Sequence, residues 1–154
     1  MELQLDRIDR QILNTLQRNN RISNQQLAEE ISLSPPACLK RVKRLRESGV
    51  IEADVAILST RLLGKMLNII VEVEMIRDQA DLADAFMRKM QNAGEVTQCY
   101  QVTGEVDFLL VVMVPDMQAY EVFVRRDLSN DPYLRKFRTL ISMRRDKFTT
   151  RIDV

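Results

Sequence analysis

Histidine and tryptophan are absent from this chain of 154 residues. The lack of histidine removes the side chain that most often acts as a general base in enzymes and most often binds transition metals. The two cysteines, Cys38 and Cys99, do not have the spacing of a zinc-binding pair, and neither GxGxxG nor GxxxxGK[ST] occurs. We therefore expect no metal, no cofactor and no catalytic residues, and we do not expect an enzyme.

Long apolar runs are missing as well. No segment approaches the ~20 consecutive apolar residues that a membrane-spanning helix needs. The first ten residues, MELQLDRIDR, are acidic and polar, whereas a secretory signal would combine a basic segment with an apolar one. Both cysteines lie within apolar patterns, as buried thiols in a reducing compartment do. These features predict a cytoplasmic protein without a membrane segment.

The net charge is only +1, but its distribution along the chain is uneven. Residues 1–50 carry nine Lys/Arg and six Asp/Glu, and residues 51–154 carry fourteen and sixteen. Five of the positive side chains fall within the seven residues from Lys40 to Arg46. This asymmetry predicts an N-terminal module that faces an anion and a C-terminal module with another role.

The N-terminal third begins with the signals of two short helices. Asp6 is suited to cap the first, and its apolar residues recur at helical spacing. These residues are Ile8, Ile12, Leu13 and Leu16. Ser23 and Gln26 have the spacing of a capping box at the start of the second helix. Ile22 and Leu27 are placed to form a hydrophobic staple across that start.

A third helix is predicted from Ser34, its expected cap, to Glu47. Pro35 occupies the first helical position, where a missing N–H costs little, and Gly49 suits the left-handed residue after the helix end. One narrow apolar stripe is formed by Cys38, Val42 and Leu45. The charged residues that fall away from this stripe are Lys40, Lys43, Arg44 and Glu47. The helix therefore has one apolar side and one mainly cationic side.

Three short helices followed by an extended segment over Asp54–Ser59 are typical of a winged helix-turn-helix. We assign residues 1–52 to this domain and residues 53–64 to a linker strand. A cationic helix side suits the major groove of double-stranded DNA, where Lys and Arg neutralise phosphates. The alternative is an ordinary solvated basic face, but the agreement of the caps, staple, proline and glycine favours DNA binding.

Residues 65–154 show the pattern β-α-β-β-α-β. The expected elements are a strand over 67–75, a helix from Asp78 to Gly94, strands over Glu95–Val102 and Phe108–Val114, a helix capped by Asp116, and a strand over Phe137–Met143 that residues 148–152 can extend. This order predicts a ferredoxin-like domain, with a four-stranded antiparallel sheet and both helices on one face. The fold class is therefore α+β.

The strand over Phe108–Val114 is apolar at every position, so both of its faces require burial. The two helices cover one face of the sheet, and a second copy of the chain is the natural cover for the other. This predicts a symmetric homodimer that holds two recognition helices at a fixed distance. The alternative is that the tail, Phe148–Val154, folds over the open face, but this tail is short and half polar.

The loop over residues 103–107 joins the two central strands. Thr103 offers a hydroxyl, Gly104 frees backbone amides, and Asp107 offers a carboxylate, which together complement a free α-amino acid. On the residues alone, the favoured interpretation is structural: Gly104 permits the turn and Asp107 bonds to backbone. The nearby Glu95 and Glu105 are more readily read as solvated loop acids than as a catalytic pair.

The chain resembles the Lrp/AsnC, or feast–famine, family of prokaryotic transcription regulators over essentially its whole length. The resemblance is carried by LDRIDRQILNTLQRNNRISNQQLAEEISLSPPACLKRVKRLRESGVI and by CYQVTGEVDFLLVVMVPDMQAY. The second stretch matches the family's VTG-x-x-D-[FY] hairpin and P-D-M helix start. The resemblance implies DNA-binding and ligand-sensing domains, and dimers assembled further into octamers that wrap DNA. It also implies an amino acid effector bound between dimers.

The resemblance also assigns residues to two sites. The expected DNA contacts on the recognition helix are Ser34, Pro36, Leu39, Lys40, Lys43 and Arg44. The expected effector contacts are Thr103, Gly104 and Asp107 in the hairpin, with Ile141 and Ser142 contributed by a neighbouring subunit. Ser142 is polar where family members usually have an apolar residue, which leaves the chemical character of the effector open.

Together these features favour a sequence-specific DNA-binding transcriptional regulator whose assembly or DNA affinity responds to a small amino acid. The alternative is an architectural DNA-wrapping protein with little sequence preference. The ratio of specific to non-specific affinity separates the two, because competitor DNA displaces an architectural protein freely.

Overall fold

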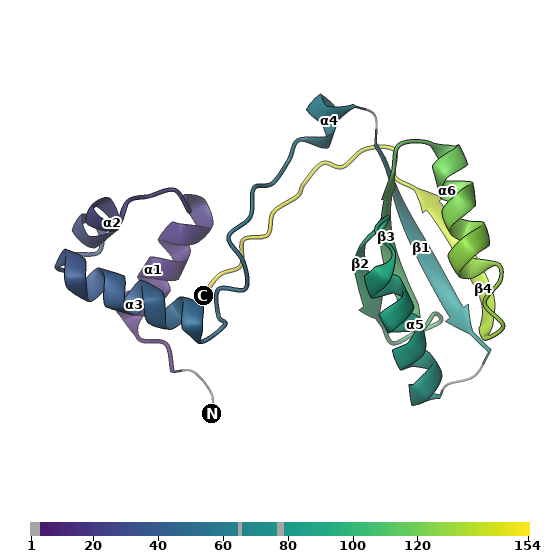
Figure 1. The fold of residues 1–154 in the computed structure, drawn as a ribbon, viewed down its shortest axis with the longest axis horizontal. Coiled ribbons are helices and arrows are strands. Elements are labelled where there is room, and N and C mark those ends of the chain that lie inside the picture. Colours follow the sequence, from purple (N-terminus) through teal and green to yellow (C-terminus); the bar gives the residue numbers. More distant parts are fainter. Residues whose placement is uncertain (1–3, 65, 77–78) are drawn as a thin grey trace. The chain divides into compact units, whose positions relative to one another are not determined.

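The computed structural model describes residues 4–64, 66–76 and 79–154. The chain divides into two compact units. The N-terminal unit runs to Ile57 and also contains the C-terminal tail, Lys147–Val154. The C-terminal unit spans Leu58–Asp146. Figure 1 shows the helices and strands of each unit.

Three helices form the N-terminal unit: α1 (Arg7–Arg18), α2 (Asn24–Glu30) and α3 (Pro35–Glu47). Their inward side chains make one apolar core. Its buried members are Ile12, Leu13, Leu27, Ala28, Ile31, Cys38, Val42 and Leu45. The predicted three-helix arrangement and the predicted stripe on α3 are therefore confirmed.

The helix starts follow the sequence signals closely. Asp6 caps α1, and Ser23 caps α2 in a reciprocal capping box with Gln26. The box at α1 is also reciprocal, since the side chain of Asp9 accepts a hydrogen bond from the backbone N–H of Asp6. Ser34 occupies the cap position of α3, although its side chain makes no capping hydrogen bond among the described residues.

The turn between α2 and α3 depends on a residue in an uncommon conformation. Ser32 has a φ of 58°, in the left-handed region that glycine normally occupies. Its N–H donates to the carbonyl of Glu29, and the N–H of Leu33 donates to the carbonyl of Ala28. These two bonds are those of a Schellman motif, which ends α2 and sends the chain directly into α3.

The C-terminal tail packs against α1. The side chain of Gln17 bonds to the backbone of Ile152, and Asn14 Nδ2 donates to the carbonyl oxygen of Val154 at 3.4 Å. Val154 also packs against the core of the N-terminal unit. The predicted extension of the last strand over residues 148–152 is therefore wrong. The tail, which was the alternative cover for the sheet, belongs instead to the N-terminal unit.

The linker differs from its prediction. Asp54–Ser59 has no strand in the described chain, and a short helix α4 (Thr60–Leu63) follows instead. A strand needs a neighbouring strand that bonds to its backbone groups. The alternation of Val55 and Ile57 indicated a strand but did not specify such a partner. The expected linker strand is thus an extended connection in the single chain.

The C-terminal unit contains a four-stranded antiparallel sheet in the order β2-β3-β1-β4. Its elements are β1 (Leu67–Met75), α5 (Ala80–Asn92), β2 (Val96–Gln101), β3 (Phe108–Val114), α6 (Met117–Phe123), a π-helix η1 (Val124–Leu128) and β4 (Leu134–Ile141). This is the predicted ferredoxin-like order. The expected cap Asp78 lies outside the described residues.

The two faces of this sheet differ in burial. Alternate residues of β1 and β3 are buried against side chains of α5 and α6, and the centroids of the Phe86 and Phe108 rings lie 4.8 Å apart. The opposite side, which we call the open face, carries a group of partly exposed apolar residues. They are Ile70, Tyr100, Leu109, Val111, Met113 and Leu140. Among the described residues of this unit, therefore, one face of β3 is buried and the other stays partly exposed.

Candidate nucleic-acid interface and ligand-binding hairpin

The outer side of α3 is the candidate nucleic-acid interface. Cys38 and Leu45 are fully buried on the inner side, whereas Leu39 is 57% exposed. All six residues predicted to contact DNA are exposed and lie on α3 or at its cap. A shallow groove on this helix is lined by Ala37, Lys40, Arg41, Lys43, Arg44 and Glu47. Its walls thus carry four cations, as binding to a phosphate backbone requires.

The lysines of this groove remain close to solvent. Lys43 Nζ lies 3.7 Å from a carboxylate oxygen of Glu47, one helical turn away, and both side chains are well exposed. Exposed pairs of this kind contribute roughly 0–1 kcal/mol and weaken with salt. The Lys43 ammonium therefore stays available for an external phosphate.

The two arginines of the groove are held differently. Arg41 Nη1 lies 2.6 Å from Asp6 and 2.9 Å from Asp9, and Arg44 Nη2 lies 2.5 Å from Asp9. Asp9 is 1% exposed. The predicted DNA contact Arg44 is thus already bonded to a buried carboxylate of α1. Asp9 was not among the predicted site residues, although its three-residue spacing from Asp6 is that of a capping box.

The charge states of this cluster follow from its hydrogen bonds. The backbone N–H of Asp9, followed by the Arg41 guanidinium, lowers the pKa of Asp6 to about 2. The same contacts with Asp6 and Asp9 raise the pKa of Arg41 above its ordinary range. At neutral pH, Asp6 is therefore anionic and Arg41 cationic, and this side of α3 carries less net charge than its sequence indicates.

Two further contacts fix the position of α3. Asn24 Nδ2, at the start of α2, donates to the carbonyl oxygen of Pro35 at 2.9 Å. At the other end, Gly49 has a φ of 78°, which confirms the predicted left-handed residue after the helix. The start of α3 is thus tied to α2, and the chain turns sharply where α3 ends.

The candidate ligand-binding hairpin joins β2 and β3. Thr103 and Gly104 are exposed, and Gly104 has a φ of 132° that disfavours other residues. Asp107 Oδ2 accepts a hydrogen bond from the backbone N–H of Met75 at 2.6 Å, and the N–H of Asp107 donates to Val73 at 2.9 Å. These contacts agree with the structural interpretation of the loop. The side-chain bond engages one of the two carboxylate oxygens.

The five expected ligand contacts form two groups near opposite ends of β1. The hairpin group lies beside Met75. In the other group, Ile141 pairs with Ile69, and the N–H of Ser142 donates to Asn68 at 2.9 Å. Met75 follows Ile69 by six positions, a distance of ~20 Å at ~3.3 Å per strand residue. A single chain therefore does not bring the two groups together.

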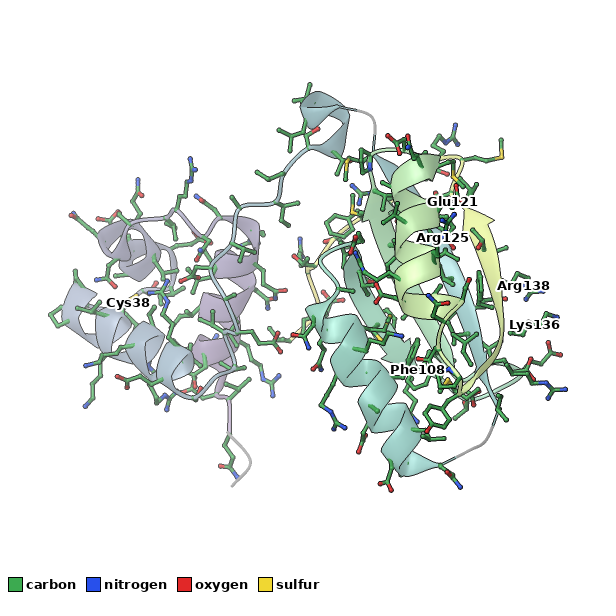
Figure 2. All side chains as sticks on the ribbon, turned by 45° about the vertical axis from the view of Figure 1, so that its right-hand side comes forward. Cys38, Phe108, Glu121, Arg125, Lys136 and Arg138 are labelled. Atoms are coloured by element: carbon green, nitrogen blue, oxygen red, sulfur yellow. The ribbon has the colours of Figure 1, made fainter. Side chains whose placement is uncertain are left out.

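The open face of the sheet is charged near the hairpin. Arg138 bonds to Glu72 across β4 and β1, and Arg135 Nη1 lies 3.0 Å from Glu74. Figure 2 shows Lys136 and Arg138 projecting outward from β4. A shallow depression here is lined by Glu72, Glu74, Glu105, Val106, Lys136, Phe137 and Arg138. The open face thus combines apolar residues with a charged region beside the hairpin.

Both cysteines are free thiols, and burial raises the pKa of Cys38 and of Cys99. Within residues 4–64, 66–76 and 79–154, no cluster of three His, Cys, Asp or Glu side chains is arranged to hold a metal ion. The helices of these same segments include none with the length and apolarity needed to cross a bilayer.

Two family models match the chain, one for each unit. A winged helix-turn-helix DNA-binding model matches residues 5–52, and an Lrp/AsnC ligand binding domain model matches residues 68–152. The first match contains α1, α2 and α3, and the second contains the sheet and the hairpin.

Similar proteins match over nearly the full length. The leucine-responsive regulatory protein of Escherichia coli is 38% identical over 150 residues, which cover 97% of this chain and 92% of that protein. An uncharacterized HTH-type transcriptional regulator of Sinorhizobium fredii is 42% identical, covering 99% and 90%. The crystal structure of a Neisseria meningitidis transcriptional regulator in complex with L-Met has a TM-score of 0.86 at 32% identity, covering 96% and 95%.

Proposed function

The chain belongs to the Lrp/AsnC family of DNA-binding transcriptional regulators, and we propose that α3 is its recognition helix. The observation that carries the proposal is the division of α3 into a buried stripe and an exposed cationic side. Lys40 and Lys43 neutralise phosphates, and Leu39 contacts a thymine methyl group in the major groove. Ser34, Pro36 and Arg44 complete the contact surface.

The proposed effector is a free α-amino acid. The ligand-binding model covers the sheet and hairpin, and the Neisseria relative was crystallised with L-Met. Amides near Gly104 and the hydroxyl of Thr103 suit a carboxylate, and Asp107 suits an ammonium group. Since Ile141 and Ser142 lie at the far end of β1, a neighbouring subunit supplies them. The site is therefore complete only in an assembly.

The proposed assembly begins with a homodimer through the open face. Its partly exposed apolar residues, such as Ile70 and Met113, are covered when two sheets pack together. Further association of dimers, up to an octamer, places the hairpin of one dimer beside β4 of another.

An amino acid that prefers one arrangement shifts the population toward it and changes the spacing of recognition helices. A regulator that binds chromosomal DNA in this way acts in the cytoplasm, which is the proposed location of the protein.

Two experiments test this function. A thermal-shift screen against the proteinogenic amino acids identifies any effector, because a ligand that binds only the folded state raises Tm. A flat screen would contradict amino acid sensing. DNA binding is tested with the triple variant Lys40→Ala/Lys43→Ala/Arg44→Ala on duplexes that the wild-type protein selects from a random library. Unchanged binding by the folded variant would exclude α3 as the recognition helix, and free displacement by competitor DNA would favour the architectural role.

A further inference from the structure

Asp9 is a buried carboxylate with three donors around it. It accepts from the backbone N–H of Asp6 at 3.2 Å, from Arg41 Nη1 at 2.9 Å and from Arg44 Nη2 at 2.5 Å. Its side chain is 1% exposed. Removing a carboxylate from water is costly unless charged partners compensate it, so Asp9 fixes the positions of its partners more firmly than an exposed acid does.

The spacing of the two arginines explains how both reach Asp9. Arg41 and Arg44 are three residues apart on α3, so their side chains lie on the same side of the helix. Their exposures differ, with 29% of the Arg41 side chain and 49% of the Arg44 side chain accessible. Arg44 is thus anchored at one nitrogen and still open to solvent along the groove that it shares with Lys40 and Lys43.

An anchored guanidinium differs chemically from the lysines beside it. Arginine presents five N–H donors in a planar fork, whereas a lysine ammonium is a mobile point charge. The hydrogen bond to Asp9 uses Nη2 of Arg44, and the rest of the fork retains donors for an external acceptor. Fixing the plane of the fork lowers the entropy lost when Arg44 binds, so its contact with DNA becomes directional.

The same contacts reduce the non-specific attraction of α3 for DNA. Asp6 and Asp9 balance the charges of Arg41 and Arg44, so this group of four residues is neutral. Non-specific affinity depends on the number of phosphates that are neutralised, and a neutral group adds little to it. Asp9 therefore favours selected sequences over other DNA in two ways: it fixes the orientation of Arg44, and it limits the positive charge that attracts any duplex.

We propose that Asp9 is a positioning residue for DNA recognition, which orients Arg44 toward an acceptor on the duplex and limits the positive charge of α3. The inference rests on the proposed role of α3 as the recognition helix. It assigns to α1 a part in sequence discrimination, although Asp9 itself is too deeply buried to contact DNA.

The test compares affinities of the full chain for two duplexes across a series of salt concentrations. One duplex is selected by the wild-type protein from a random library, and the other is a shuffled duplex of the same composition. For Asp9→Asn we expect the ratio of the two affinities to fall about tenfold, the size of one directed base contact. Affinity for the shuffled duplex should rise, and its salt dependence should steepen by about one released counterion.

Asp6→Asn is the matched control. It removes the exposed partner of Arg41, keeps a residue that caps helices well, and leaves the Asp9–Arg44 contact in place. Because this variant adds the same unit of positive charge, its affinity for the shuffled duplex should also rise, but the affinity ratio should stay within about twofold of wild type since no directed contact is lost. In the Arg44→Ala background, Asp9→Asn should cause no further loss on the selected duplex, because the two residues act through one contact.

The outcomes separate the inference from the proposed function. If Arg44→Ala lowers the ratio while folded Asp9→Asn changes both affinities by the same factor, Asp9 has only a structural role and the inference is wrong. If neither Arg44→Ala nor Lys43→Ala alters binding, the recognition-helix assignment itself fails. If Asp9→Asn does not fold, Arg44→Lys replaces it: this change keeps the charge and removes the fork, and an unchanged ratio would overturn the inference.

Discussion

Gln17 and Ile152 form a reciprocal pair of hydrogen bonds across 135 residues of sequence. Gln17 Nε2 donates to the carbonyl oxygen of Ile152 at 2.9 Å, and the N–H of Ile152 donates to Gln17 Oε1 at 2.8 Å. The side-chain amide thus bonds to the backbone as a neighbouring strand would. The pair attaches the C-terminal tail to α1, so the N-terminal unit is built from both ends of the described chain.

Loss of this pair should weaken the N-terminal unit. Gln17→Ala removes two hydrogen bonds at a solvent-exposed position, and we expect the free energy of unfolding to fall by about 1 kcal/mol. Chemical denaturation followed by circular dichroism measures the change. Gln11→Ala, at an exposed position of the same helix, is the control and should be neutral or slightly stabilising. Equal effects of the two changes would mean that the tail adds no stability.

The conformation of Ser32 makes Ser32→Gly a stabilising change. A side chain at a φ of 58° is disfavoured, and glycine relieves this while adding freedom to the unfolded chain. We expect a net gain of about 0.5–1 kcal/mol in the free energy of unfolding. Ser32→Ala keeps the Cβ and serves as the control. A gain that appears equally in the alanine variant would implicate the hydroxyl instead of the backbone.

The carboxylate of Asp6 should make the stability of the folded chain depend on pH in the acidic range. Its pKa falls from an ordinary 3.8 to about 2 in the folded chain, so the folded state favours the ionised form. The resulting stabilisation is fully present above about pH 4 and is lost as the pH falls toward 2. We therefore expect the Tm difference between wild type and Asp6→Asn to shrink over this range. A difference that stays constant from pH 6 to pH 2 would show that the carboxylate charge is irrelevant.

Two substitutions at Asp107 separate its structural and ligand-binding roles. Asp107→Asn keeps an oxygen for the N–H of Met75, so the fold should persist, while the charge that suits an ammonium group is lost. Asp107→Ala also removes the hydrogen bond and should cost about 1–2 kcal/mol of stability. Calorimetric titration with the amino acid found by thermal shift should show binding lost in both variants. Retained affinity in Asp107→Asn would exclude a contact with the ammonium group.

A charged substitution can test whether the open face of the sheet is the dimer interface. Val111→Asp places a carboxylate at the centre of the apolar group on β3, where burial against a second sheet would be costly. We expect light scattering to detect monomers in place of dimers. Val122→Asp introduces the same change on α6, where the side chain is 57% exposed, and should leave the assembly intact. Dissociation by both variants, or by neither, would locate the dimer interface elsewhere.

Local signals predicted most of both folds. Helical spacing and caps such as Ser23 identified the three N-terminal helices, and alternation along residues 67–75 and 108–114 identified the central strands. Contacts between distant residues carry no such periodic signal. The docking of Ile152 on α1 and the pairing of Asp9 with Arg44 therefore emerged only from the structure.

The linker shows the opposite failure. The alternation around Val55 and Ile57 satisfied a strand pattern, but strand formation depends on a partner that a linear pattern does not specify. The hairpin residue Asp107 shows a third case, because the same side chain fits a backbone contact and a ligand contact. The sequence predicted that Asp107 would bond to a backbone group. It did not predict that this group would be the N–H of Met75.

The docked tail makes residues 58–146 an insertion within the N-terminal unit. Folding of that unit must close a loop of this length, and the entropic cost of closure falls when the inserted chain is already ordered. A ligand that stiffens the insertion can therefore stabilise the helices that carry the DNA-binding surface without displacing any of them. The chain passes between the two units twice, and this double connection couples the stability of one unit to the order of the other. A single linker would not couple them in this way.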